Sequence, residues 1–424
     1  MNKNSLKSYY DVAVIGGGVS GVSAAVAAAE CGKSVLLIEQ DGGPGGTAVF
    51  AGCPVFDGFG AEGQPIVGGF AERFIDNLAA DFDVVQTSSQ GPTTTVSKPY
   101  AGTYSAPEID ILLTLNRMLK KAGVDVIYYA TVFNVEMVNR IIKKIGIYFL
   151  GNTFEVSAGS FVDATGDACL AKLAKLPTID APAEKGMTKT VLFQVSGVKD
   201  FDKAGLRTRF AELAKQKLFP YPAQDLFMGS RVGSDNDSLL LNATLIAGNP
   251  LDPIERTSMD MELREQIPVI IDWFKKHLPQ LSNCSFRSMA SRIGVRAGRN
   301  LCGRETITQS DLIDNAPVAE PVARGRRSFG GHGISSFNSG ANKFTAGSRS
   351  IPFGALLSPD ADNYYCAGRG ISVEVEAITA IRLMICCMAT GEAAGCAAAL
   401  GAEKQEIPAY AALQKVLLSR GAVL

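Results

Sequence analysis

Residues 10–47 read YDVAVIGGGVSGVSAAVAAAECGKSVLLIEQDGGPGGT, and this stretch decides the fold. The apolar run at 12–15 predicts a buried strand, and the alanine-rich run at 24–29 predicts a helix. Residues 34–38 predict a second apolar strand. A strand, a glycine-rich turn, a helix and a second strand form the start of a nucleotide-binding βαβ unit.

The glycines of this stretch satisfy G-x-G-x-x-G at Gly16, Gly18 and Gly21, and Glu39 ends the second strand. In this pattern Gly16 allows the tight turn, Gly18 lets the backbone approach a pyrophosphate, and Gly21 lets the helix pack closely on the strands. The helix N-terminus offers free N–H groups to phosphate, and Glu39 can accept hydrogen bonds from a ribose diol. A glycine-rich turn in an unrelated α/β protein is the alternative, which the strand–helix context disfavours.

A second glycine-rich loop, at 42–46, follows the acid directly and favours FAD, because a plain NAD domain would usually continue into another helix. Segments 163–167 and 367–369 resemble strand-end motifs of FAD enzymes, where only glycine fits beside the cofactor. An ordinary packing glycine is the alternative for either segment alone. The predicted FAD-binding residues are Gly16, Gly18, Val19, Ser20, Gly21, Glu39, Gln40, Gly45, Gly46, Thr47, Ala164, Thr165, Gly166, Asp167, Gly368 and Arg369.

The order of these motifs is similar to that of the FAD-dependent oxidoreductase family, within the two-dinucleotide-binding-domain flavoprotein superfamily, over nearly the whole chain. Segments 293–299 and 351–353 add to the resemblance. It implies FAD as the cofactor and oxidoreductase activity toward an unidentified small organic substrate. The chain departs from the family pattern at Ala297, where a Glu is common, and at 372–376, where a His is common. Both departures concern substrate chemistry more than FAD binding.

The 424-residue chain is long enough for two or three domains. The strand-then-helix pattern of its start returns after residue 350, whereas the residues between change character. We therefore predict an α/β fold with a discontinuous, Rossmann-like FAD-binding domain of residues 9–175 and 350–424. A mixed α+β substrate domain, residues 176–349, is predicted as the insert.

The composition limits the partners. With 41 basic and 42 acidic residues, the net charge of −1 gives no support to a nucleic-acid or anionic-membrane partner. We expect no apolar run to reach the roughly 18 residues of a membrane span, and hence a cytoplasmic location. Nine cysteines without a C-x-x-C, and two histidines, argue against a metal site. A small-molecule substrate is the expected partner, with a homo-oligomer or a redox partner left open.

Four residues are candidates for a role in the chemistry. His332, in a glycine-rich loop, suits proton transfer near neutral pH, the alternative being a loop histidine with no role. Arg296 and Arg299 could clamp a substrate carboxylate, or form structural ion pairs. Cys53 could place a thiolate beside the flavin or be a buried structural thiol. Ala48 stands where disulfide reductases, which this segment resembles, carry their other cysteine, so a disulfide relay is excluded.

The sequence thus predicts an FAD-dependent oxidoreductase that transfers a hydride between a small organic substrate and flavin. Two alternatives stay open at this point. One is a dehydrogenase that binds NAD at the same fingerprint. The other is a flavin-binding subunit without turnover.

Overall fold

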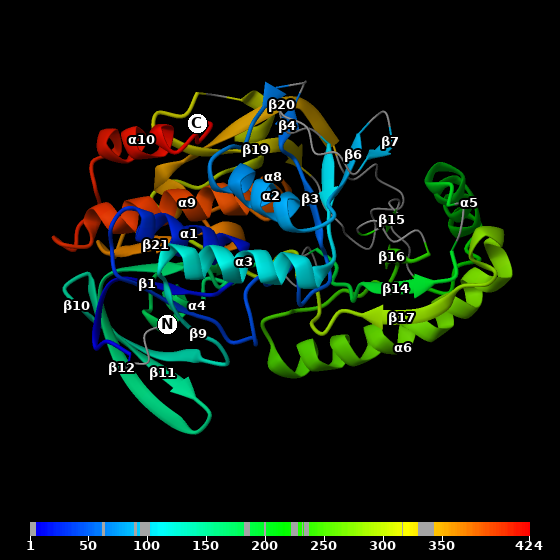
Figure 1. Ribbon diagram of the computed structural model, residues 1–424, viewed down its shortest axis with the longest axis horizontal. Helices are drawn as coiled ribbons and strands as arrows, with labels where there is room; N and C mark the ends of the chain where they lie inside the picture. Colours follow the sequence, from blue (N-terminus) through cyan, green and yellow to red (C-terminus); the bar gives the residue numbers. More distant parts are fainter. Residues whose placement is uncertain are drawn as a thin grey trace.

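The computed structural model describes residues 6–61, 64–88, 91–93, 102–181, 187–198, 201–221, 228–230, 232, 237–315, 317–329 and 343–424. Figure 1 shows a larger α/β part that contains both ends of the chain and a smaller part beside it.

A seven-stranded sheet lies in the larger part and combines strands from both ends of the chain. Its strands are β1 (Tyr9–Ile15), β2 (Val35–Ile38), β9 (Asp125–Ile127), β10 (Thr131–Val138), β11 (Ile141–Phe149), β12 (Asn152–Asp163) and β21 (Tyr364–Cys366). Their order is β10-β11-β12-β1-β2-β9, and β21 pairs with the last residues of β12. The pairs among β9, β2, β1, β12 and β21 are parallel, as a Rossmann-like fold requires. β10 and β11 form an antiparallel hairpin that extends the sheet.

Helices pack on this sheet, and two of them touch backbone to backbone (Figure 1). The helices of this layer are α1 (Val19–Glu30), α2 (Phe70–Asp81), α3 (Glu108–Ala122), α9 (Met384–Gly401) and α10 (Tyr410–Ser419). A Cβ at Gly391 of α9 would lie 2.2 Å from the carbonyl oxygen of Ser20 in α1, and a Cβ at Gly395 would lie 2.2 Å from that of Ala24. Only glycine permits this approach, so α1 and α9 hold the two ends of the chain in one core.

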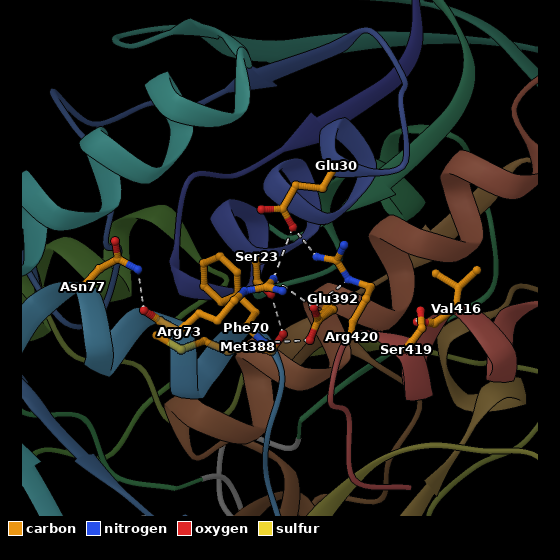
Figure 2. Close-up of polar contacts among 10 residues, drawn as sticks. All are labelled: Ser23, Glu30, Phe70, Arg73, Asn77, Met388, Glu392, Val416, Ser419 and Arg420. Atoms are coloured by element: carbon orange, nitrogen blue, oxygen red, sulfur yellow. Dashed lines mark hydrogen bonds and ion pairs between the residues drawn. The ribbon is translucent and has the colours of Figure 1, made fainter. Parts of the chain in front are cut away.

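The buried carboxylate of Glu392 on α9 joins α2 and α10 to this helix pair (Figure 2). Its Oε2 accepts the N–H of Phe70, at the start of α2, at 2.8 Å. Its Oε1 accepts hydrogen bonds from Arg73 at 3.2 Å and from Arg420, which follows α10, at 2.9 Å. Both guanidinium groups also pair with Glu30 at the end of α1. Four helices therefore meet at one charge-compensated carboxylate.

α9 is long and apolar enough to cross a membrane, contrary to the sequence-based expectation. Among the described residues it is the only helix that meets this criterion of length and composition. However, 83% of its residues are buried inside the fold, as in the core helix of a globular protein. The apolar composition of α9 is explained by its packing against α1 and the sheet. The cytoplasmic location stays a prediction.

The smaller part contains a four-stranded antiparallel sheet with two helices, seen on the right of Figure 1. Its order is β15-β16-β14-β17. The bounds are β14 (Phe193–Ser196), β15 (Met228–Ser230), β16 (Leu239–Asn242), β17 (Ser285–Met289), α5 (Lys203–Lys215) and α6 (Pro253–His277). Asp252 caps α6, since its Oδ1 accepts the N–H of Glu255 at 2.8 Å. Phe210, Phe219 and Trp273 stack edge to face within this part.

Shorter elements complete the fold. They are β3 (Val55–Asp57), β4 (Gly60–Ala61), β5 (Gln64–Pro65), β6 (Val85–Ser88), β7 (Gly91–Thr93), β8 (Thr103–Ser105), α4 (Cys169–Leu173), β13 (Thr178–Asp180), η1 (Pro279–Leu281), β18 (Arg299–Leu301), α7 (Gln309–Asp314), β19 (Pro321–Phe329), β20 (Lys343–Pro352), η3 (Phe353–Leu356), η4 (Gly368–Gly370) and α8 (Ile378–Ile381). β19 and β20 form an antiparallel hairpin.

Two sequence-based expectations need correction. Residues 48–107 are rich in Gly, Pro, Ser and Thr, and their sequence predicts an irregular region with a short helix at Phe70–Leu78. The helix is confirmed as α2, whereas the sheet β3-β8-β6-β7 is not predicted. A single helix was expected over 376–400, but the chain breaks at Leu383, whose extended ψ of 134° separates α8 from α9. The helix predicted from 107 to 122 is confirmed as α3, which ends at left-handed Gly123.

The predicted division into domains can be compared with the hydrophobic cores. One core spans the large sheet and the C-terminal helices, and a second runs from Val191 to Ile293 within the predicted insert. Leu301, Ile307 and Val322 pack in the first core, although they lie in the predicted substrate domain of residues 176–349. The division into domains stays a prediction, and the second core is shorter than the predicted insert.

The contact between α1 and α9 gives a first prediction. We expect Gly395→Ala to destabilise the protein by about 1–3 kcal/mol, because the new Cβ would force α1 and α9 apart. This outweighs the gain of up to about 1 kcal/mol in helix propensity. Urea denaturation measures the change, with Leu400→Ala as the control at a position on α9 that is 40% exposed. A Gly395→Ala midpoint equal to that of the wild type would contradict the close contact.

Candidate functional site

The predicted FAD-binding residues gather at the carboxyl ends of four adjacent parallel strands. Gly16 to Gly21 follow β1, Glu39 to Thr47 follow β2, Ala164 to Asp167 follow β12, and Gly368 and Arg369 follow β21. Backbone hydrogen bonds join these strand ends, from the N–H of Gly16 to the carbonyl of Ile38 at 2.8 Å and from that of Ala164 to Ile15 at 2.8 Å. The carboxyl edge of a parallel sheet is where folds of this kind bind nucleotides.

Two fingerprint glycines serve close packing. Gly16 has a φ of +101°, and a Cβ there would lie 2.6 Å from the carbonyl oxygen of Ala164. A Cβ at Gly21 would lie 1.8 Å from the carbonyl oxygen of Gly16. Any side chain at either position would push the start of α1 away from the strand ends.

Gly18 differs from both, because a Cβ there would meet no described atom within 4 Å. Gly18 is the N-cap of α1 and gives no side-chain cap, and the first turn of α1 has no acidic residue. Opposite it, Gly45 donates its N–H to the carbonyl of Gly17 at 2.8 Å, and Gly46 approaches the Cα of Gly18. Open space at an uncapped helix N-terminus fits the pyrophosphate of a dinucleotide.

Glu39 is buried between backbone N–H groups. Its Oε2 accepts the N–H of Gly17 and its Oε1 accepts that of Asp41 at 2.7 Å. Burial raises the pKa of the Glu39 carboxyl, and the two N–H groups oppose that shift. Each carboxylate oxygen has a second lone pair, so Glu39 can still accept ribose hydroxyls. The neighbouring Gln40 and Thr47 are exposed.

The segment after β12 is held by two carboxylates. Asp163 is fully buried and accepts hydrogen bonds from the Oγ1 of Thr165 at 2.6 Å and from the hydroxyl of Tyr364 at 3.2 Å. Asp167 pairs with Arg369 at 2.7 Å, and the charge of Arg369 helps to lower the pKa of Asp167 against the effect of burial. The backbone between these carboxylates is thereby fixed beside the strand ends.

The candidate catalytic residues have different surroundings. Arg299 donates from Nε to Asp180 at 2.7 Å, so the ion-pair alternative holds for Arg299. Arg296 has no carboxylate partner among the described residues, and it donates to the carbonyl of Thr188 at 2.7 Å. His332 lies outside the described residues, and its role stays a prediction.

Cys53 is partly buried and lies close to Arg296, whose charge acts on its thiol. Burial raises the pKa of the Cys53 thiol, and Arg296 opposes this shift only in part. The thiol is therefore protonated at neutral pH, which favours a structural role over a thiolate beside the flavin.

Two cations near the site were missed by sequence reasoning. Lys189 is buried, donates from Nζ to the carbonyl of Gly248, and has its pKa lowered to about 8 by burial. Arg382 follows α8, and its Nε is shielded from solvent without a hydrogen-bond partner. Arg382 is a lone charge within an apolar run of the sequence, a signal that could have pointed to it, whereas Lys189 lies between two threonines and carries no such signal.

The sequence of the chain matches a family model over residues 11–417, and that family is described as FAD dependent oxidoreductase. The chain therefore belongs to this family of flavoproteins, and FAD is its cofactor. The predicted family and cofactor are confirmed, and the NAD alternative is set aside.

Solved structures are similar to this chain at low identity. The flavin-dependent brominase Bmp2 has 15% identity over 96% of this chain and 83% of its own, with a TM-score of 0.50. A geranylgeranyl bacteriochlorophyll reductase-like protein from Thermoplasma acidophilum has 14% identity over 98% of this chain and 84% of its own, with a TM-score of 0.48. At such identities the likeness concerns the fold alone. A comparison with curated proteins finds no match.

The open space at Gly18 predicts that a substitution there affects FAD binding and not the stability of the protein itself. We expect Gly18→Ala to weaken FAD binding about tenfold or more, because its methyl group would occupy the open space at the helix N-terminus. The thermal midpoint of the FAD-free protein should stay unchanged, since that methyl group meets no protein atom. Released FAD per chain and thermal unfolding of the FAD-free protein measure the two effects.

Gly21→Ala is the matched control. Its methyl group would strike the Gly16 carbonyl, so the FAD-free protein itself should lose about 1–3 kcal/mol of stability. Equal thermal midpoints for the two FAD-free variants would contradict the assigned difference between Gly18, which faces open space, and Gly21, which packs against the Gly16 carbonyl.

Proposed function

We propose that this chain transfers a hydride between a small organic substrate and FAD. The proposal is supported by the contact between the FAD-binding loop and the segment that carries Arg296. Phe50, just past that loop, accepts hydrogen bonds on its carbonyl from the N–H of Arg292 at 2.9 Å and from the hydroxyl of Ser291 at 3.1 Å. Gly52 lies against Ala290. A substrate held at Arg296 would therefore lie beside the residues that follow the second glycine loop.

Bound FAD supplies the group that accepts or gives up the hydride, and the protein supplies orientation and charge. Arg296 is held by the carbonyl of Thr188 and faces Asn242, at 3.4 Å, so its remaining N–H groups are available for a substrate. A guanidinium can fix a carboxylate through two parallel hydrogen bonds. His332 is the proposed proton acceptor, since an imidazole titrates near neutral pH.

Anaerobic mixing of the yellow holoprotein with a panel of small organic acids, alcohols and amines tests the proposal. We expect one class to bleach the visible band of the oxidised flavin at a saturable rate. If FAD is bound at one per chain and no member of the panel, nor any reduced nicotinamide, bleaches it, the non-catalytic subunit becomes the better description.

His332→Asn tests the proton-transfer step. We expect the rate of flavin bleaching to fall by roughly 10²–10⁴, the usual contribution of a general base, while FAD content stays normal. His277→Asn is the control, because His277 stacks on Trp273 with ring centroids 4.7 Å apart, at the end of α6. Bleaching of His332→Asn at the wild-type rate would reject this role for His332.

A further inference from the structure

Arg382 has no counter-ion in the part of the chain that the structure describes. It lies at the break between α8 and α9, where its backbone N–H bonds to the carbonyl of Ile378 at 3.1 Å. Its Nε is shielded from solvent without any hydrogen-bond partner, although the residue as a whole keeps some accessible surface. Among the described residues it forms no ion pair.

Arg296 has neutral partners only, within the described part of the chain. It donates to the carbonyl of Thr188 and to the side-chain oxygen of Asn242. Burial and the charge of Arg382 lower the pKa of Arg296 to about 9. Burial likewise lowers the pKa of Arg382 to about 10. The two positive charges therefore oppose each other in a poorly solvated place. The segments that carry them both contact residues 52–58, since a Cβ at Gly52 would lie 3.1 Å from Ala290 and one at Gly58 would lie 2.8 Å from Leu383.

Three other arginines of this region, by contrast, each have a carboxylate partner. Arg292 pairs with Asp41, and Arg369 pairs with Asp167 at 2.7 Å. Arg299, in the next strand after Arg296, has Asp180. A protein that leaves a buried charge uncompensated loses stability, so the exception calls for a ligand that supplies the missing charge.

Cys53 does not supply that negative charge. It lies close to both Arg296 and Arg382, and their charges favour its thiolate. Burial has the larger effect and raises the pKa of the thiol above its usual value. Two positive charges therefore face a neutral thiol.

We propose that Arg296 and Arg382 together bind the carboxylate of the substrate, so that this enzyme acts on an organic acid. That the bound acid is a substrate rests on the proposed hydride transfer, whereas binding of the acid does not depend on it. Arg382 thereby takes the place that the sequence suggested for Arg299 in a two-arginine clamp. A carboxylate accepts up to four hydrogen bonds and can neutralise both guanidinium groups at once.

The test uses the holoprotein and acetate or oxalate, organic acids that serve as probes of binding. Titration with either probe is followed by the visible spectrum of bound FAD and by thermal unfolding, with sodium chloride at equal ionic strength as the control for screening. We expect saturable binding to the wild type and a loss of about tenfold or more in affinity for Arg382→Met, the effect of removing one charge-assisted contact. Binding of inorganic phosphate in place of both acids would overturn the assignment to carboxylates.

A second readout separates a binding role from a structural one. Without probe, Arg382→Met should unfold at the wild-type temperature or above it, because the substitution removes an uncompensated charge. A lower midpoint, or a loss of FAD, would make Arg382 a structural or cofactor residue and would overturn the proposal. Arg304→Met is the matched control, since Arg304 is 40% exposed and lies near Asp362, and it should keep the wild-type response to the probes.

The outcome for the proposed function is read separately. Unchanged oxalate and acetate binding by Arg382→Met rejects the carboxylate site whatever the catalytic results are. Failure of every organic acid to bleach the flavin, with normal probe binding, rejects hydride transfer from acids and leaves the anion site in place.

Discussion

The rest of the structure depends on the close packing of α1 against α9. Gly391 and Gly395 let the carbonyl groups of Ser20 and Ala24 approach within a distance that no side chain allows. The first helix of the chain is thereby fixed to a helix near its other end, and both lie on the same parallel sheet. The N-terminus of α1 is the predicted site of the pyrophosphate, so the direction of this helix would set the position of the cofactor.

Glu392 extends this constraint to regions without sequence signatures of their own. A buried carboxylate is costly unless it is paired and hydrogen-bonded, and here Arg73, Arg420 and the N–H of Phe70 satisfy it. The negative charge also lies at the N-terminal end of α2, where the helix dipole favours it. Loss of this one side chain would leave the two guanidinium groups with only the exposed carboxylate of Glu30 as a partner.

The sequence predicts the nucleotide-binding half well because its signals are local. The glycines of the fingerprint, Glu39 and the strand ends at 163–167 and 367–369 each carry their meaning within a few residues. By contrast, in the sheet β3-β8-β6-β7 the strands β3 and β8 pair although they lie far apart in the sequence. Short strands among Gly, Pro, Ser and Thr also look like loop. The break at Leu383 was also hidden, since helix-forming residues lie on both sides of it.

Arg296 and Arg299 illustrate the limit for the site. In the sequence they are equivalent candidates three positions apart, and only the fold reveals that Asp180 neutralises one of them. The apolar run around Arg382 hints that this residue is buried, but only the fold shows that no described carboxylate pairs with it. Charge compensation depends on residues distant in the sequence, so it could not be read from the motif.

The two unpaired arginines also come from different parts of the fold. Arg296 follows the small sheet and its core, whereas Arg382 belongs to the connection between α8 and α9 in the larger part. Their mutual repulsion opposes close contact at this junction, and an anion held by both would convert that repulsion into attraction. A ligand that binds only the native state stabilises it in proportion to its concentration. The bound acid would therefore stabilise the junction between the two parts, where it also has to meet the flavin. Binding of its charge and alignment of the two parts would then occur together.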